Sequence, residues 1–204
     1  MAKRKINSRG YSPRKVDTRE FKQRFLIVCE GSKTEPNYFR SFRVPKNVVE
    51  VDVRGLGEDP SRLVRSAQDL KNKDGDDYDQ IWCVFDRDSW TLENFNNAIS
   101  SATSQGFKVA YSNESFELWY ILHFEYLNTG IPRKDYIHKL SLLLVGQKYQ
   151  KNSETIYDEL LARQPIAIRN AENLLKEYNP PVAANDNPST TVHLLVQELN
   201  RFIQ

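Results

Sequence analysis

Acidic side chains follow two apolar segments of this chain, and their spacing could support metal chemistry. Glu30 ends the apolar segment FLIVC, and Asp86 and Asp88 follow the later segment IWCVF. Residues two apart on an extended backbone project to the same side, which predicts that the two aspartates point the same way. Three carboxylates in one place repel one another unless cations neutralise them. Oxygen ligands favour Mg²⁺ or Mn²⁺, which can hold phosphate oxygens and activate water for phosphodiester cleavage.

Each of these acids also has an explanation that involves no metal. An Asp-X-Asp sequence is common in loops, and Glu30 followed by Gly31 can be a simple turn. Acids at the start of a helix cap it and interact favourably with its dipole. The metal interpretation therefore requires that the fold bring all three carboxylates to one edge of a sheet.

The order of predicted elements provides such an edge. Apolar patterns predict strands at 25–30, 48–55, 80–85 and 107–113, and helical patterns predict helices at 34–43, 59–73, 92–106 and 115–124. Strands that alternate with helices indicate parallel βαβ units with helices on both faces of the sheet. The first and third strands are continuously apolar, as central strands are. Ligands of such sheets bind beyond the carboxyl ends of the strands, where the acids lie.

The pattern changes after Tyr126, where helices are predicted at 134–146, 155–178 and 190–204 and no strand is predicted. With 204 residues, the chain suits one globular domain, or one domain with a helical appendage. We therefore predict three parts. They are a basic N-terminal arm over residues 1–24, an α/β core over 25–125, and a helical extension over 126–204 that packs on the core.

The basic arm stands out once the net charge of +2 is divided along the chain. Residues 1–24 hold nine Lys and Arg side chains against Asp17 and Glu20, so the arm carries +7 and the remainder −5. Such an arm can bind the phosphates of nucleic acid. The alternative is a solvated tail whose charge only keeps the protein in solution.

Other features limit the class of protein. Cys29 and Cys83 lie in apolar segments and predict reduced, packed thiols, and no cysteine or histidine cluster has the spacing of a zinc site. No apolar run approaches the ~20 residues of a membrane span. The charged N-terminus is not followed by the apolar core of a secretory signal, so a cytoplasmic location is expected.

Further candidate residues lie in the segments SNESFELW and EGSKTE and beside the aspartates. Asn113 could bind a phosphate or cap a helix, and Glu117 could act as a fourth acid or only favour the first turn of its helix. Lys33 and Arg87 could bind phosphate or be surface charges. EGSKTE lacks the second glycine and the Gly-Lys-Ser/Thr ending of a P-loop, so nucleotide hydrolysis is not predicted. Phe116, Trp119 and Tyr120 share one helical face and are expected in the core, not on a base-stacking platform.

The chain resembles a known family once these segments are taken together. A strand ending in Glu-Gly and a later strand ending in Asp-X-Asp resemble the TOPRIM metal-binding domain of topoisomerases, primases and overcoming-lysogenisation nucleases. The segments IVCEGSKTEPNYFRSF, WCVFDRDSW, YSNESFELWYILHF and NPSTTVHLLV resemble the RloB-like family more closely. They span residues 27–196, nearly the whole chain.

This resemblance implies a TOPRIM-like fold and Mg²⁺- or Mn²⁺-dependent nuclease activity. It also implies a bacterial or archaeal anti-phage defence protein, often encoded beside a partner ATPase at a restriction-modification locus. By the family's motif, Glu30 would be the general base or a metal-associated acid, and Asp86 and Asp88 would be the metal ligands. The alternatives are a catalytically silent regulatory subunit that binds the ATPase and a nucleic-acid-binding module. The sequence does not distinguish a DNA substrate from an RNA substrate.

Overall fold

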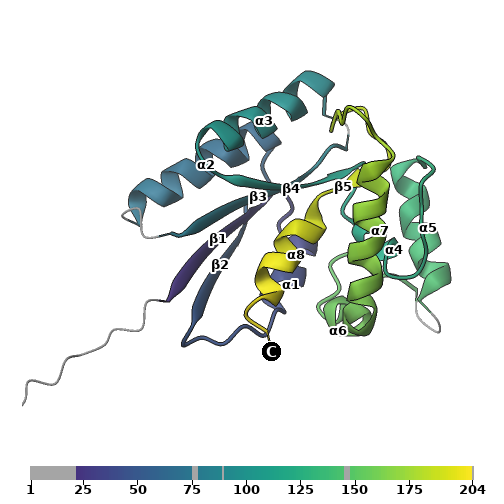
Figure 1. Ribbon diagram of the computed structural model, residues 1–204, viewed down its shortest axis with the longest axis horizontal. Coiled ribbons are helices and arrows are strands. Elements are labelled where there is room, and N and C mark those ends of the chain that lie inside the picture. Colours follow the sequence, from purple (N-terminus) through teal and green to yellow (C-terminus); the bar gives the residue numbers. More distant parts are fainter. Residues whose placement is uncertain (1–21, 75–77, 89, 145–147, 204) are drawn as a thin grey trace, which may run out of the picture.

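Five strands form one sheet in the computed structural model, which describes residues 22–74, 78–88, 90–144 and 148–203. The strand order is β2-β1-β3-β4-β5, and the first four strands in this order are parallel, whereas β5 runs antiparallel to β4 (Figure 1). The strands are β1 (Gln23–Cys29), β2 (Val49–Gly55), β3 (Gln80–Asp86), β4 (Lys108–Asn113) and β5 (Ser189–Thr190). The predicted α/β class with a parallel sheet is confirmed, and the arrangement is consistent with a TOPRIM-like domain.

Helices cover both faces of the sheet. Figure 1 shows α2 (Pro60–Lys73) and α3 (Leu92–Ser104) on one face and α1 (Thr34–Arg40) and α8 (Val192–Asn200) on the other. The second face also carries α4 (Glu117–Ile121), α5 (Arg133–Leu143), α6 (Ile156–Leu160), a short 3-10 turn (Leu161–Arg163) and α7 (Gln164–Lys176). Because β1 and β3 lie inside the sheet between these layers, their side chains are buried on both faces, which explains their continuous apolar sequences.

Local sequence signals fix the helices that follow β2 and β3. The Asp59 side chain accepts a hydrogen bond from the Arg62 amide at the start of α2. Thr91 caps α3 in the same way, through the Asn94 amide. Gly106 follows α3 with a φ of 76°, a conformation that glycine adopts without steric cost. These caps agree with the helices predicted for both segments.

Two predicted helices differ from the structure, and one strand of the structure was not predicted. The helix predicted at 115–124 is only the five residues of α4, because the amides of His123 and Phe124 bond to carbonyls three residues back and the chain continues as turns. The helix predicted at 155–178 is interrupted before α7, whose second residue is Pro165. The strand β5 was not predicted, since its two polar residues carry no apolar pattern.

The C-terminal segment packs on the second face of the sheet. Val192, Leu195, Val196 and Leu199 of α8 are fully buried in the same apolar cluster as Phe25 of β1. This cluster joins residues from both sides of position 125, so the boundary between core and extension at this position stays a prediction. The arm over residues 1–24 falls almost entirely outside the described residues.

The two cysteines are free and buried, as predicted, with Cys29 packed on one face of the sheet and Cys83 on the other. Within the described ranges, every helix is too short or too polar to cross a membrane.

Candidate functional site

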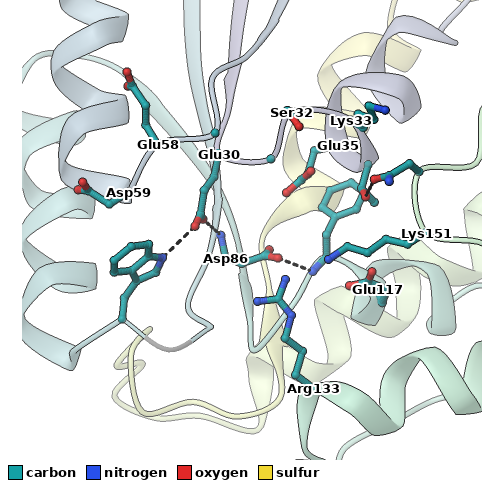
Figure 2. A pocket seen from close by; sticks show the side chains of 16 residues that line it. Glu30, Ser32, Lys33, Glu35, Glu58, Asp59, Asp86, Glu117, Arg133 and Lys151 are labelled. Carbon is teal, nitrogen blue, oxygen red and sulfur yellow. Dashed lines mark hydrogen bonds between the residues drawn. The ribbon is translucent and has the colours of Figure 1, made fainter.

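A cavity of about 490 Å³ lies at the carboxyl ends of β1 and β3, which is the edge where the sequence predicted a site. Figure 2 shows its lining, which comes from the ends of these strands, the loop at 57–59 before α2, Trp90 after β3, the first turn of α1, the start of α4 and two later segments. Its ionisable side chains are the acids Glu30, Glu35, Glu58, Asp59, Asp86 and Glu117 and the bases Lys33, Arg133 and Lys151. The acids outnumber the bases, so the cavity favours cations.

Glu30 is held by hydrogen bonds to both of its carboxylate oxygens. The Asp86 amide donates to Oε2 at 2.8 Å, and the Trp90 indole donates to Oε1 at 2.8 Å (Figure 2). Burial raises the pKa of Glu30, and these two hydrogen bonds oppose that rise. The end of β1 is therefore fixed to the end of β3 through one carboxylate of defined orientation.

Asp86 is buried, and only one of its two carboxylate oxygens has a hydrogen-bond partner among the described residues. Its Oδ2 accepts a hydrogen bond from the Phe116 amide at 3.0 Å, whereas its Oδ1 is buried without a hydrogen-bond partner among the described residues. Burial, with further contributions from Glu35, Glu30 and Glu117, raises the pKa of Asp86 well above its ordinary value. A buried oxygen in such surroundings requires either a proton or a cation.

Glu35 is an acid of the cavity that the sequence analysis did not single out. It lies in the first turn of α1, only 5% exposed, and its carboxylate packs so closely on Gly31 that a Cβ there would overlap it. Burial, followed by the charges of Glu117 and Glu30, raises the pKa of Glu35 to about 7. Its position offered a signal, because it begins the helix that leaves the same strand end as Glu30.

Glu117 also faces the cavity, from the first residue of α4. Its side chain is buried and accepts a hydrogen bond from the Tyr149 hydroxyl at 3.3 Å. The structure thus brings Glu117 close to Glu35 and Asp86, although its role stays a prediction. Phe116, Trp119 and Tyr120 are buried in the core, as expected. 

Asp88 lies differently from the prediction. The extended backbone ends at Asp86, and Asp88 has a φ of 37°, so the alternation of a strand does not extend to it. Its carboxylate forms an ion pair with Arg133, and it is not among the residues that line the cavity. Arg133 itself does line the cavity, so Asp88 lies behind a basic side chain of the site.

The three predicted phosphate ligands also separate in the structure. Lys33 lines the cavity. Arg87 and Asn113 do not, because the Arg87 guanidinium donates to the Asp88 carbonyl at 2.7 Å and the Asn113 amide donates to the carbonyls of Ala183 and Ala184. The Asn113 bonds tie the end of β4 to the loop at 183–184, whereas the Arg87 bond reaches only the next residue, and phosphate binding by either residue stays a prediction.

Lys151 is a base of the cavity that the sequence analysis did not single out. The neighbouring Asn152 accepts hydrogen bonds from the Thr34 hydroxyl at 3.0 Å and, through its carbonyl, from the Asn37 amide at 3.1 Å. These contacts join the loop to α1 across more than a hundred residues of sequence. They place Lys151 beside the acids (Figure 2), where its charge lowers the pKa of Glu35 against the larger effect of burial.

The side chains of the cavity are of the types that bind a hard divalent cation, but their positions in this structure do not form a complete set of ligands. Carboxylate oxygens are the donors that Mg²⁺ and Mn²⁺ prefer, and the unpartnered Asp86 Oδ1 offers one. However, the described part of the chain contains no group of three His, Cys, Asp or Glu side chains placed to hold an ion. Arg133 and Trp90 engage Asp88 and Glu30 instead. The metal therefore stays a prediction.

Comparison with known proteins gives one match. A family model described as RloB-like protein matches residues 25–199, a range that runs from within β1 to within α8 and contains the whole lining of the cavity. No curated protein and no solved structure matches the chain.

Proposed function

Since the chain belongs to the RloB-like family, we propose that its acidic cavity is the active site of a Mg²⁺- or Mn²⁺-dependent nuclease that hydrolyses phosphodiester bonds in DNA or RNA. The observation that carries this proposal is the Asp86 Oδ1, which is buried without a hydrogen-bond partner among the described residues and lies at the carboxyl edge of the sheet with other carboxylates whose pKa is raised. Acids of this kind are costly to bury and are typical of functional sites.

Asp86, Glu35 and Glu117 are the residues that would hold the cation, with Asp88 available once it leaves Arg133. When bound, the cation supplies charge neutralisation and an acidified water molecule. Glu30 is oriented by its two hydrogen bonds and has a raised pKa, so it is suited to accept a proton from the attacking water.

The basic side chains of the cavity would hold the substrate. Lys33, Lys151 and Arg133 line the side of the cavity opposite Glu58 and Asp59 (Figure 2). Ammonium and guanidinium groups form charge-assisted hydrogen bonds with phosphate oxygens. Arg133 would leave Asp88 and bind a phosphate group, and this exchange would free the Asp88 carboxylate for the cation.

By resemblance to its family, we further propose that the protein acts with a partner ATPase in anti-phage defence. The alternative function is a catalytically silent regulatory or nucleic-acid-binding subunit of the same complex. The absence of three suitably placed ligand residues in the described chain favours this alternative. The intact acidic cluster favours the nuclease, because a silent subunit does not need buried anions that repel one another.

A cleavage assay distinguishes the two functions. Labelled DNA and total RNA are incubated with the protein in Mn²⁺, with and without the ATPase. The Asp86→Asn variant keeps an acceptor for the Phe116 amide and should lose activity by about 10²-fold or more. Asp69→Asn, on the exposed face of α2, is the matched control and should cleave normally. Equal cleavage by the Asp86 variant, or no cleavage under any condition, would reject the nuclease.

A further inference from the structure

A second groove, of about 370 Å³, lies beside β2 at the edge of the sheet and shares no residue with the acidic cavity. Its floor is apolar and its rim is mostly basic, with Glu50 as its one acid. The apolar residues are Phe39, Phe42, Val44, Val49, Val51 and Val53, and the basic residues are Lys22, Arg40 and Lys46.

The groove runs along backbone groups that the sheet leaves open. The Gln23 amide donates to the Val48 carbonyl and the Leu56 amide donates to the Cys29 carbonyl, so even-numbered residues of β2 face β1 and odd-numbered residues face away. Two outward groups are satisfied, since the Val49 amide bonds to Pro45 and the Val53 carbonyl bonds to Arg40. Within the described chain, no strand pairs with the outward N–H and C=O of Val51.

The positive charge of the rim indicates which kind of molecule the groove can bind. Among the described residues, Lys22, Arg40 and Lys46 form no ion pair, whereas Glu50 lies 3.7 Å from the Arg24 Nε. The groove therefore presents three cations, and the basic residues 1–21 lead directly to Lys22 on its rim. The chain's own arm is repelled by this rim, and a second copy would bring the same cations face to face.

We propose that this groove binds an extended acidic segment of a partner protein, which adds to β2 as a further strand. Its backbone would pair with Val51, its apolar side chains would cover the half-buried Val44 and Val51, and its carboxylates would reach the basic rim. A nucleic acid strand would use only the cations. Phe39 and Phe42 are 1% and 7% exposed, so they offer no surface on which bases could stack. This binding site is independent of the proposed nuclease.

The test uses the full chain and a fluorescein-labelled, end-capped peptide of seven residues in which Glu alternates with Val. Fluorescence anisotropy should show binding without metal or nucleic acid. Lys46→Glu should weaken it by about tenfold, and the same peptide with Lys in place of Glu should not bind. Lys176→Glu, exposed on α7, is the matched control and should bind normally.

Two further measurements separate strand addition from simple charge attraction. Val51→Pro removes an outward amide, which an edge strand tolerates, and should abolish binding; its fold is checked by its thermal transition. A peptide methylated on its central backbone nitrogens should likewise fail with the unaltered protein. Normal binding of the methylated peptide would overturn the proposal, and so would a parent peptide that does not bind. Displacement of the parent peptide by oligothymidine would also overturn it, if oligothymidine binds the Val51→Pro variant as tightly as it binds the unaltered protein. None of these results bears on the nuclease.

Discussion

Replacing Glu35 by glutamine is expected to stabilise the protein in the absence of divalent cations, and to do so more strongly as pH rises. The substitution keeps the shape of a side chain that is 5% exposed and removes its charge beside Glu117 and Glu30. Glutamine also supplies an N–H₂ group that can donate to those carboxylates. The cavity should therefore accept the new side chain without a change of fold.

The magnitude follows from the pKa of Glu35, which the fold raises from 4.5 to about 7. Between these two values the folded protein binds more protons than the unfolded chain, so its stability falls as pH rises. One pKa unit corresponds to 1.36 kcal/mol, so the ionised residue costs about 3 kcal/mol at pH 8 and less than about 1 kcal/mol at pH 5. The Glu35→Gln variant should recover these amounts.

Urea unfolding in EDTA at pH 5 and pH 8 measures this difference in stability. A shift of the urea midpoint at an unchanged dependence on urea concentration reports a change in the free energy of unfolding. Because Asp86 and Glu30 also have raised pKa values, both proteins will lose stability with rising pH, and the informative quantity is the gap between them. Glu93→Gln, exposed on α3, is the matched control and should change stability equally at both pH values. A Glu35→Gln gap that is the same at pH 5 and pH 8 would refute the repulsion on which the site is argued.

Three other variants test neighbouring parts of the site and chain. Trp90→Phe keeps the ring but removes the hydrogen bond to Glu30, so cleavage in saturating Mn²⁺ should be about tenfold slower; an unchanged rate would mean that this bond does not position the acid. Arg133→Gln should bind Mn²⁺ more tightly, because it releases Asp88, and nucleic acid more weakly, and opposite signs in the two titrations are the required outcome. Deletion of residues 1–20 should weaken nucleic-acid binding and flatten its salt dependence while leaving the urea midpoint nearly unchanged; an unaltered slope removes the arm from the binding surface.

Much of the fold could be predicted because its signals are local. The apolar segments FLIVC and IWCVF occupy the interior of the sheet, and Asp59 and Thr91 cap helices a few residues away. By contrast, β5 consists of Ser189 and Thr190, whose burial is compensated by hydrogen bonds such as Ser189 to the Asp186 carbonyl. Polar residues satisfied by distant partners leave no periodic pattern in the sequence.

As with the fold, only part of the candidate site could be predicted from the sequence. Glu30 and Asp86 could be placed together because parallel strands deliver their carboxyl ends to one edge. The prediction for Asp88 was wrong about its direction because it applied strand geometry two residues beyond the end of β3. Arg133 and Lys151 come from segments far along the chain, and only tertiary contacts such as that between Thr34 and Asn152 bring such segments to the cavity.

The most direct test of the central claim is a Mn²⁺ titration of the free energy of unfolding, with the unaltered protein and Asp86→Asn compared at pH 8. A cation that binds only the folded state stabilises it by about 2.7 kcal/mol when present at one hundred times its dissociation constant. The proposed site predicts a saturable rise of this size for the unaltered protein and a rise displaced to at least about tenfold higher Mn²⁺ for the variant. Equal responses of the two proteins, or no response of the unaltered protein at millimolar Mn²⁺, would contradict a metal site at Asp86.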